Sequence, residues 1–247
     1  MKKFVMLGIS ISLWMLLTMQ SAAESLQVVT LQYPPFEYEE QGAIKGIAVD
    51  IVKEVFARMQ QPITITLYPF ARALNMIKES EADAIFTFSK LPERETYADY
   101  PSEVLIEQTI SLFVQQDAPI TYDGDISSLR SYTCGVIRGA QYGPVSDEAM
   151  KIMKVEEVTD HRQNVLKLVN NRLDVILGPR LVILFTIKEL GQQGAVKELS
   201  PSLETVPTYL AFSKTRIAPE IKVQFERLLK ELKDDGTYDK IIQAYIQ

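Results

Sequence analysis

Apolar positions along the chain follow two periods, one typical of strands and one typical of helices. Short apolar or β-branched runs at residues 26–31, 63–67 and 84–88 predict buried strands. Between them, apolar side chains repeat at helical spacing over residues 47–59 and again over residues 71–80. This β-α-β-α-β order predicts a parallel sheet covered by helices.

The same order of elements returns in the second half of the chain. Residues 133–137 and 155–159 read as strands, and Asp160 begins a helix in which Gln163 is placed to complete a capping box. An apolar strand follows at residues 175–177. The chain is therefore predicted to contain two α/β units.

The two units share a local pattern. In each, an apolar helix ends, an aspartate follows, and a buried strand comes next; the aspartates are Asp83 and Asp174. Two lobes of common design would explain the likeness, and coincidence within the common vocabulary of α/β proteins is the alternative.

Long apolar strands at residues 108–115 and 205–212 lead out of the first unit and back from the second. Two such crossings predict a hinge about which the lobes close. Residues 219–247 predict helices interrupted at Gly236, which should return to the first lobe. The predicted division is lobe 1 at residues 24–113 and 207–247, and lobe 2 at residues 114–206.

The N-terminus predicts a secretory signal peptide. Lys2 and Lys3 precede the uncharged apolar run 4–19, and the small residues of 21–23 suit cleavage after Ala23. A membrane anchor is the alternative, but the run is shorter than the ~20 residues that span a bilayer. We therefore predict segment 1–23 to be removed and the protein to reside in the periplasm.

Charge and composition narrow the function classes. The sequence has 26 basic and 32 acidic residues, and without the two lysines of the signal segment the balance is 24 − 32 = −8. An acidic surface argues against nucleic acid and anionic lipid as partners. One cysteine and one histidine do not make a zinc site. We expect no metal and no cofactor, with Cys134 buried in its strand and His161 on the surface.

Several short motifs, in this order and at these intervals, resemble the bacterial extracellular solute-binding proteins, family 3, which are the periplasmic receptors of polar amino acid transporters. The motifs occupy residues 33–36, 46–51, 82–85, 92–94, 173–176 and 232–238. The resemblance implies a two-lobed, type II periplasmic binding protein-like α/β fold with two hinge crossovers and a ligand cleft between the lobes. It also implies a monomer that delivers a small solute to the membrane permease of an ABC transporter.

The resemblance also implies ligand contacts. Arg94 matches the arginine that clamps the ligand carboxylate, a role that suits the planar guanidinium fork. Tyr33 and Phe70 match aromatic walls of the cleft, and Thr87 and Ser89 match polar positions that bind the ligand. An exposed helix-start charge is the alternative for Arg94, and ordinary core packing is the alternative for the two rings.

Two departures from the family pattern bear on the ligand. The second-lobe Gly-Thr-Thr motif is replaced by Gly139-Ala140-Gln141, which keeps the backbone amides for an anion but loses the hydroxyls. The usual aspartate that neutralises an ammonium is replaced by Gly178-Pro179-Arg180. Because a buried ammonium without an acid partner is costly, we predict a ligand other than a standard α-amino acid held in the usual way.

Four arginines fall at predicted strand-to-helix junctions, namely Arg72, Arg94, Arg138 and Arg180. If two or three converge on the cleft, the ligand is an anionic organic acid or an acidic amino acid derivative; solvated first-turn residues are the alternative. The predicted function is periplasmic capture of a carboxylate-bearing solute, amino acid-like or anionic, with a ligand sensor or a dehydratase-like enzyme as alternatives. We predict no enzyme, because no histidine or paired-carboxylate motif supplies an acid or base.

Overall fold

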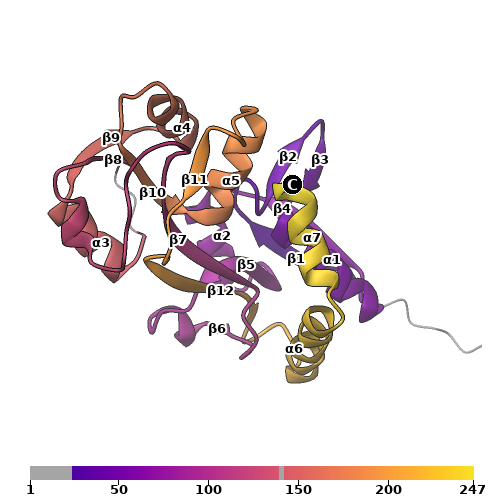
Figure 1. Ribbon diagram of the computed structural model, residues 1–247. Coiled ribbons are helices and arrows are strands. Elements are labelled where there is room, and N and C mark those ends of the chain that lie inside the picture. Colours follow the sequence, from indigo (N-terminus) through magenta and orange to yellow (C-terminus); the bar gives the residue numbers. More distant parts are fainter. Residues whose placement is uncertain (1–23, 139–141) are drawn as a thin grey trace, which may run out of the picture.

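A computed structural model describes residues 24–138 and 142–247. The signal segment 1–23 and the predicted ligand residues Gly139, Ala140 and Gln141 lie outside the described residues. Figure 1 shows a mixed α/β molecule with two halves. On one side lie the N-terminal elements and the C-terminal helices α6 (Pro219–Asp234) and α7 (Thr237–Ile246). On the other side lie α3 (Pro144–Ile152) and α4 (His161–Val169).

One curled sheet runs through both halves in the order β4-β1-β5-β12-β7-β10-β8-β9. The strands on this path are β1 Leu26–Thr30, β4 Ile63–Leu67, β5 Ala84–Ser89, β7 Ile106–Gln115, β8 Thr133–Ile137, β9 Lys154–Val158, β10 Val175–Pro179 and β12 Glu204–Ser213. The remaining strands are β2 Tyr38–Glu40, β3 Ala43–Lys45, β6 Ala98–Asp99 and β11 Val196–Glu198. The predicted strands are therefore present, and none of their ends is shifted by more than two residues.

The parallel parts of the sheet lie at its two ends. Strands β4, β1 and β5 are parallel to one another, and so are β10, β8 and β9. Between these groups, β12 and β7 pair antiparallel with each other and with the flanking strands. Each of these two strands is 10 residues long, so both halves share the pair as a continuous connection.

The likeness of the two units extends to individual hydrogen bonds. The Asp83 backbone N–H donates to the Gln27 carbonyl at 2.9 Å, and the Asp83 carboxylate accepts the Gln27 N–H at 2.7 Å. The Asp174 N–H likewise donates to the Thr133 carbonyl at 3.0 Å, and its carboxylate accepts the Thr133 N–H at 2.8 Å. Each aspartate thus joins the start of one parallel strand to the start of its neighbour, so the sequence likeness reflects a repeated structural unit.

The helices of the first half are α1 (Ile47–Arg58) and α2 (Phe70–Lys78). The buried face of α1 packs with the C-terminal helix α6, where Phe225 lies between the rings of Phe56 and Phe212 at 5.4 and 5.7 Å. Gly236 adopts φ 76° between α6 and α7, a left-handed conformation that favours glycine. The C-terminal helix α6 therefore packs against α1 in the first half of the molecule.

Helix α5 (Arg180–Glu189) has no polar face, so its sequence gives no amphipathic signal. The structure supplies the reason, because α5 contacts the cores of both halves. Val182 joins the core around α1, whereas Ile183 and Ile187 join the core beneath α4. The Lys188 ammonium donates to backbone carbonyls of α7, 3.2 Å away at Tyr245. A helix that is buried on several sides therefore carries apolar residues all round.

No helix within the described ranges is long and apolar enough to cross a membrane. Over the same residues, no group of three or more histidine, cysteine, aspartate or glutamate side chains is placed to hold a metal ion. Cys134 is fully buried in β8, as predicted, and burial raises the pKa of its thiol to about 12. Such a thiol stays protonated and unreactive in the folded protein.

Candidate functional site

A cleft of about 840 Å³ lies between the two halves. Its walls come from the carboxyl ends of the parallel strands and from the shared pair β7 and β12, which is where ligands bind in open α/β sheets. The first half contributes Leu31, Gln32, Tyr33, Pro34, Phe70, Thr87 and Ser89. The second half contributes Ile137, Tyr142, Thr159, Asp160, His161, Arg162, Pro179, Val182, Phe185, Thr186 and Glu189. The shared strands add Gln108, Ile110, Val206 and Thr208.

Four of the predicted ligand residues meet on one wall of this cleft. Tyr33 follows β1, Phe70 begins α2, and Thr87 and Ser89 end β5. The Tyr33 ring packs on buried Phe36 at 5.3 Å, and its hydroxyl donates weakly to the Gln108 side chain at 3.5 Å. Burial raises the pKa of Tyr33 well above its usual range, so the phenol stays neutral.

Arg94 lies directly behind this wall. Its guanidinium stacks on Phe88 at 4.3 Å and on Phe70 at 5.6 Å, and it donates one hydrogen bond of 3.0 Å to the Ser89 carbonyl. Among the described residues, no carboxylate forms an ion pair with it. The group is half-buried, retains unused donors and adjoins two cleft residues, so it can still neutralise an incoming anion.

The other three arginines point elsewhere. Arg72 stacks over Tyr68 at 4.8 Å, Arg138 lies 3.3 Å from the Glu157 carboxylate, and Arg180 donates to both oxygens of Glu198. None of these three lines the cleft in the described part of the chain. The convergence of arginines on which an anionic ligand would depend is absent here.

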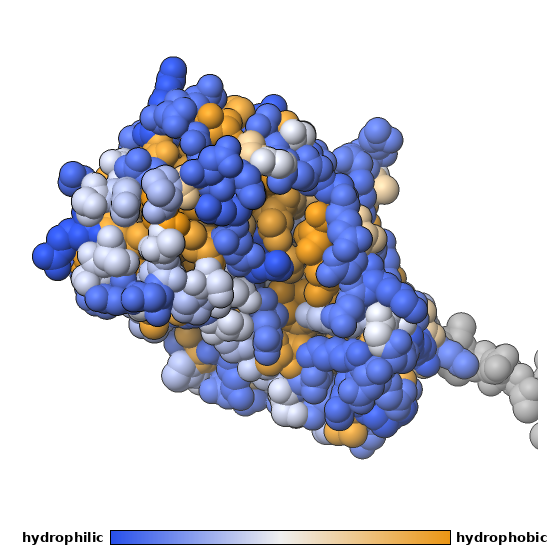
Figure 2. All heavy atoms as spheres, viewed as in Figure 1, coloured by the Kyte–Doolittle hydropathy of each residue, from blue (hydrophilic) through white to orange (hydrophobic). Residues whose placement is uncertain are grey.

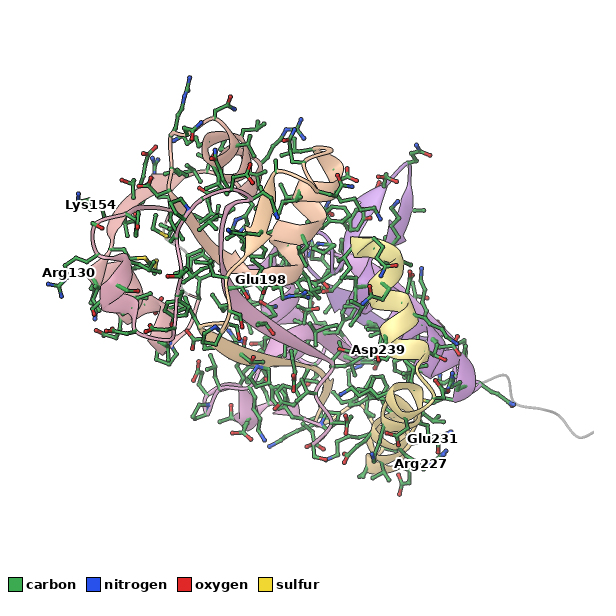
Figure 3. All side chains as sticks on the ribbon, in the orientation of Figure 1. Arg130, Lys154, Glu198, Arg227, Glu231 and Asp239 are labelled. Atoms are coloured by element: carbon green, nitrogen blue, oxygen red, sulfur yellow. The ribbon has the colours of Figure 1, made fainter. Side chains whose placement is uncertain are left out.

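Arg180 instead borders a second groove on the other face of the shared strands. Glu107 and Thr109 of β7 line this groove, whereas their neighbours Gln108 and Ile110 face the cleft, as the two-residue period of a strand requires. Figure 2 shows this face as a hollow beside α7 with apolar residues at its base. In Figure 3, Asp239 on α7 lies on one side of the hollow and Glu198 on the other.

The N-terminus of α3, where the resemblance implied an anion site, already holds a carboxylate of the same chain. The Ser146 N–H donates to Glu204 of β12 at 2.6 Å, and Gly143 leaves the space that this carboxylate occupies. Near it, the Ile137 N–H donates to the Tyr142 hydroxyl at 3.0 Å. Glu204 supplies the negative charge that a helix N-terminus favours, whereas the predicted anion-binding amides of Gly139, Ala140 and Gln141 lie outside the described residues.

His161 was expected at the surface, and the structure corrects this. The ring lines the cleft and packs on Gly178, where an added Cβ would lie 2.6 Å from the imidazole Cε1. Its Nδ1 atom is buried without a hydrogen-bond partner among the described residues. Asp160 does cap α4, as predicted, by accepting the Gln163 N–H at 2.8 Å. Sequence reasoning recognised the helix start but not that α4 begins at the rim of the cleft.

Acid should destabilise the protein through His161. Burial lowers the pKa of this histidine from 6.5 to about 4. Between pH 6.5 and pH 4, the imidazole is therefore protonated in the unfolded chain but neutral in the folded protein. The stabilising contribution is complete above pH 6.5 and is lost as the pH falls toward 4. We expect the loss of unfolding free energy between pH 7 and 4.5 to be about 2 kcal/mol smaller in His161→Gln.

Urea unfolding of both proteins at the two pH values measures this difference. Because His161 is the only histidine in the sequence, carboxylates are the other groups that titrate in this window, and they are common to both proteins. Equal losses in the two proteins would show that the folded imidazole is protonated freely.

Comparison with known proteins identifies the family. Residues 26–247 match the model of the bacterial extracellular solute-binding proteins, family 3. The chain is 24% identical to an arginine-binding periplasmic protein of Mannheimia haemolytica over 229 residues, 91% of this chain and 92% of that protein. It is 25% identical to ABC transporter arginine-binding protein 1 of Escherichia coli K12 over 227 residues, 90% of each chain.

The fold is also similar to that of known solute receptors. The crystal structure of the L-cystine solute receptor of Neisseria gonorrhoeae, in its unliganded open conformation, superimposes with a TM-score of 0.75 at 21% identity. The match covers 90% of this chain and 92% of that receptor, which confirms the predicted two-lobed, type II α/β fold. The chain therefore belongs to the bacterial extracellular solute-binding proteins, family 3.

Proposed function

We propose that this protein captures an amino acid-like solute in the cleft between its lobes and presents it to the permease of an ABC-type importer. The observation that carries the proposal is Arg94, a half-buried guanidinium without an acid partner among the described residues, beside cleft residues Phe70 and Ser89. A solute carboxylate would supply the missing partner through two parallel hydrogen bonds.

The charges of the cleft favour an amino acid over a purely anionic acid. In the described part of the chain, Arg162 is the one guanidinium that lines the cleft and Arg94 lies behind its wall, whereas Asp160 and Glu189 contribute carboxylates to the lining. This mixture suits a zwitterion that carries an ammonium as well as a carboxylate. The names of the relatives, which include arginine-binding proteins, support the same class.

The lobes are proposed to close on the solute about β7 and β12. We place lobe 1 at residues 24–113 and 207–247 and lobe 2 at residues 114–206, so that one boundary falls within each shared strand. Closure would bring Tyr142 and His161 toward Tyr33 and Phe70 and remove the solute from water. The protein is proposed to work as a monomer in the periplasm, where binding and release rather than catalysis are its role.

Isothermal titration calorimetry of the purified protein tests this proposal. The panel contains L-arginine, L-histidine, L-cystine, L-glutamate and succinate, so that cationic, disulfide-containing, acidic and ammonium-free solutes are compared. We expect micromolar or tighter binding of at least one amino acid and much weaker binding of succinate. Tight binding of succinate alone would contradict the amino acid class, and absence of any binding would contradict solute capture from this set.

A further inference from the structure

A buried glutamate lies immediately beneath the wall of the cleft. Glu37 follows Phe36 in the loop after β1, and it is 0% exposed. Its Oε2 accepts a hydrogen bond of 2.7 Å from the Thr87 hydroxyl. Its Oε1 is buried and has no hydrogen-bond partner among the described residues. Burying an ionised carboxylate in this way costs folding free energy, because one oxygen has lost its contact with water and gained no hydrogen bond. Such a residue therefore calls for an explanation.

The contact reaches the solute space through Thr87. This residue lines the cleft and adopts φ 55°, a left-handed conformation that is unusual for a β-branched side chain. The pairing register of β5 with β12 shifts at the same place, opposite Tyr209 and Ala211. Bulges and backbone outliers of this kind gather at ligand sites, and here the outlier holds one hydroxyl between the buried carboxyl and the cleft.

The surroundings of Glu37 favour its neutral form. Burial raises the pKa of this carboxyl well above its usual range, although the hydrogen bond from Thr87 opposes the shift. The ionisable group facing it is the neutral Tyr33 phenol, and Thr30 of β1 is a further uncharged polar neighbour. The charged residue in the first turn of α1, Asp50, is bound by the Tyr245 hydroxyl. No basic side chain in the described ranges pairs with Glu37.

A hydroxyl has one proton, so the state of Glu37 determines what Thr87 offers to a solute. When the carboxyl is ionised, Thr87 must donate to it, and the lone pairs of the hydroxyl are left to accept from the solute. When the carboxyl is protonated, it can donate to Thr87, whose own proton is then free to point into the cleft. The first state favours an amine on the solute, and the second favours a carbonyl or carboxylate.

We propose that Glu37 is a positioning residue whose proton sets the hydrogen-bond polarity of Thr87, and that binding of a solute amine at Thr87 releases this proton. The inference rests on the proposed function and deepens it, because it assigns an amine subsite to the first lobe. It also supplies the acid that the second-lobe sequence Gly178-Pro179-Arg180 lacks. The positive charge of the amine stabilises the Glu37 carboxylate across the intervening hydroxyl. This lowers the pKa of the carboxyl, so its proton is released to the solvent.

Proton release has a measurable sign. Affinity for an amine-bearing solute should rise with pH between 6 and 8, by up to tenfold per unit, because binding expels a proton. Burial keeps the pKa of His161 near 4, so this histidine stays neutral throughout the window. Calorimetry in phosphate and in Tris, which differ in ionisation enthalpy, counts the protons released, and we expect up to one per solute bound in the wild type.

Three variants separate the roles. Glu37→Gln should abolish proton release and flatten the pH dependence, and Thr87→Val should do the same, whereas Thr87→Ser should retain both. Glu107→Gln is the control. It makes the same chemical change at an exposed side chain on the face of β7 that points away from the cleft, so it should behave as the wild type. The probe is the amino acid from the calorimetric panel that binds most tightly. Unchanged proton release in Glu37→Gln would overturn the proposal.

Infrared difference spectra of wild type minus Glu37→Gln, taken at pH 7 without solute, test the free protein directly. A protonated-carboxyl band that disappears on adding the amino acid supports the proposal, and either its absence from the free protein or its persistence after binding overturns it. If none of the panel binds, the proposed function fails, while the band in the free protein still decides whether Glu37 holds a proton.

Discussion

Arg94→Lys should lose about 10- to 100-fold in affinity for the amino acid that the protein binds. A lysine keeps the positive charge but cannot form two parallel hydrogen bonds to a carboxylate, nor can it stack flat on Phe88 while donating to the Ser89 carbonyl. Charge-assisted hydrogen bonds contribute about 1.5–3 kcal/mol each, which corresponds to this range of affinity. Calorimetric titration of both proteins at pH 7 measures the loss.

Arg227→Lys is the matched control. Arg227 lies on the exposed face of α6 and pairs with Glu231 of the same helix, where Figure 3 shows both side chains at the edge of the molecule. Surface pairs of this kind contribute little, so affinity should be unchanged. Wild-type affinity in Arg94→Lys, together with wild-type affinity in Arg94→Ala, would remove Arg94 from the carboxylate site.

Phe225→Ala should destabilise the fold by about 3–5 kcal/mol, a large share of the ~5–15 kcal/mol that maintains a typical folded domain. The ring is fully buried between Phe56 of α1 and Phe212 of β12, so its removal leaves a cavity where the C-terminal helix meets the first half. Urea unfolding monitored by circular dichroism gives the change in unfolding free energy.

Val223→Ala provides the comparison on the same helix. This side chain is 63% exposed, so its truncation should change the unfolding free energy by no more than about 0.5 kcal/mol. If the two variants had equal stabilities, the C-terminal helix would not be packed on α1 as described, and its expected place in lobe 1 would have to be reconsidered.

Local patterns in the sequence were sufficient to predict most elements of the fold. Residues 63–67 and 133–137 are strands with the predicted bounds, and Asp160 caps its helix as expected. Strand alternation and helix capping involve neighbours within a few residues, so a single sequence reveals them. Helix α5 lacked such a signal, because it is buried against both halves and has no polar face.

The predicted ligand residues that line the cleft stand at the ends of parallel strands or, for Phe70, at the start of α2. Tyr33, Thr87 and Ser89 follow or end parallel strands, and all three line the cleft. Arg72, Arg138 and Arg180 stand at similar junctions, yet none of them lines the cleft in the described part of the chain. Arg72 stacks on Tyr68, and the other two pair with glutamates. His161 and Glu37 were missed, because burial depends on what the fold places opposite a residue.

The sequence by itself therefore determined the α/β order, the repeated unit with its two aspartates, and the family, because these depend on short-range periodicity and on motif spacing. Tertiary structure decided which distant polar groups pair with one another. Glu204 reaches the start of α3 from 58 residues away, and Thr87 binds Glu37 across 50 residues. Such pairs are selected by the geometry of the folded chain, since Coulombic and hydrogen-bond energies depend on distance in space and not on separation along the sequence.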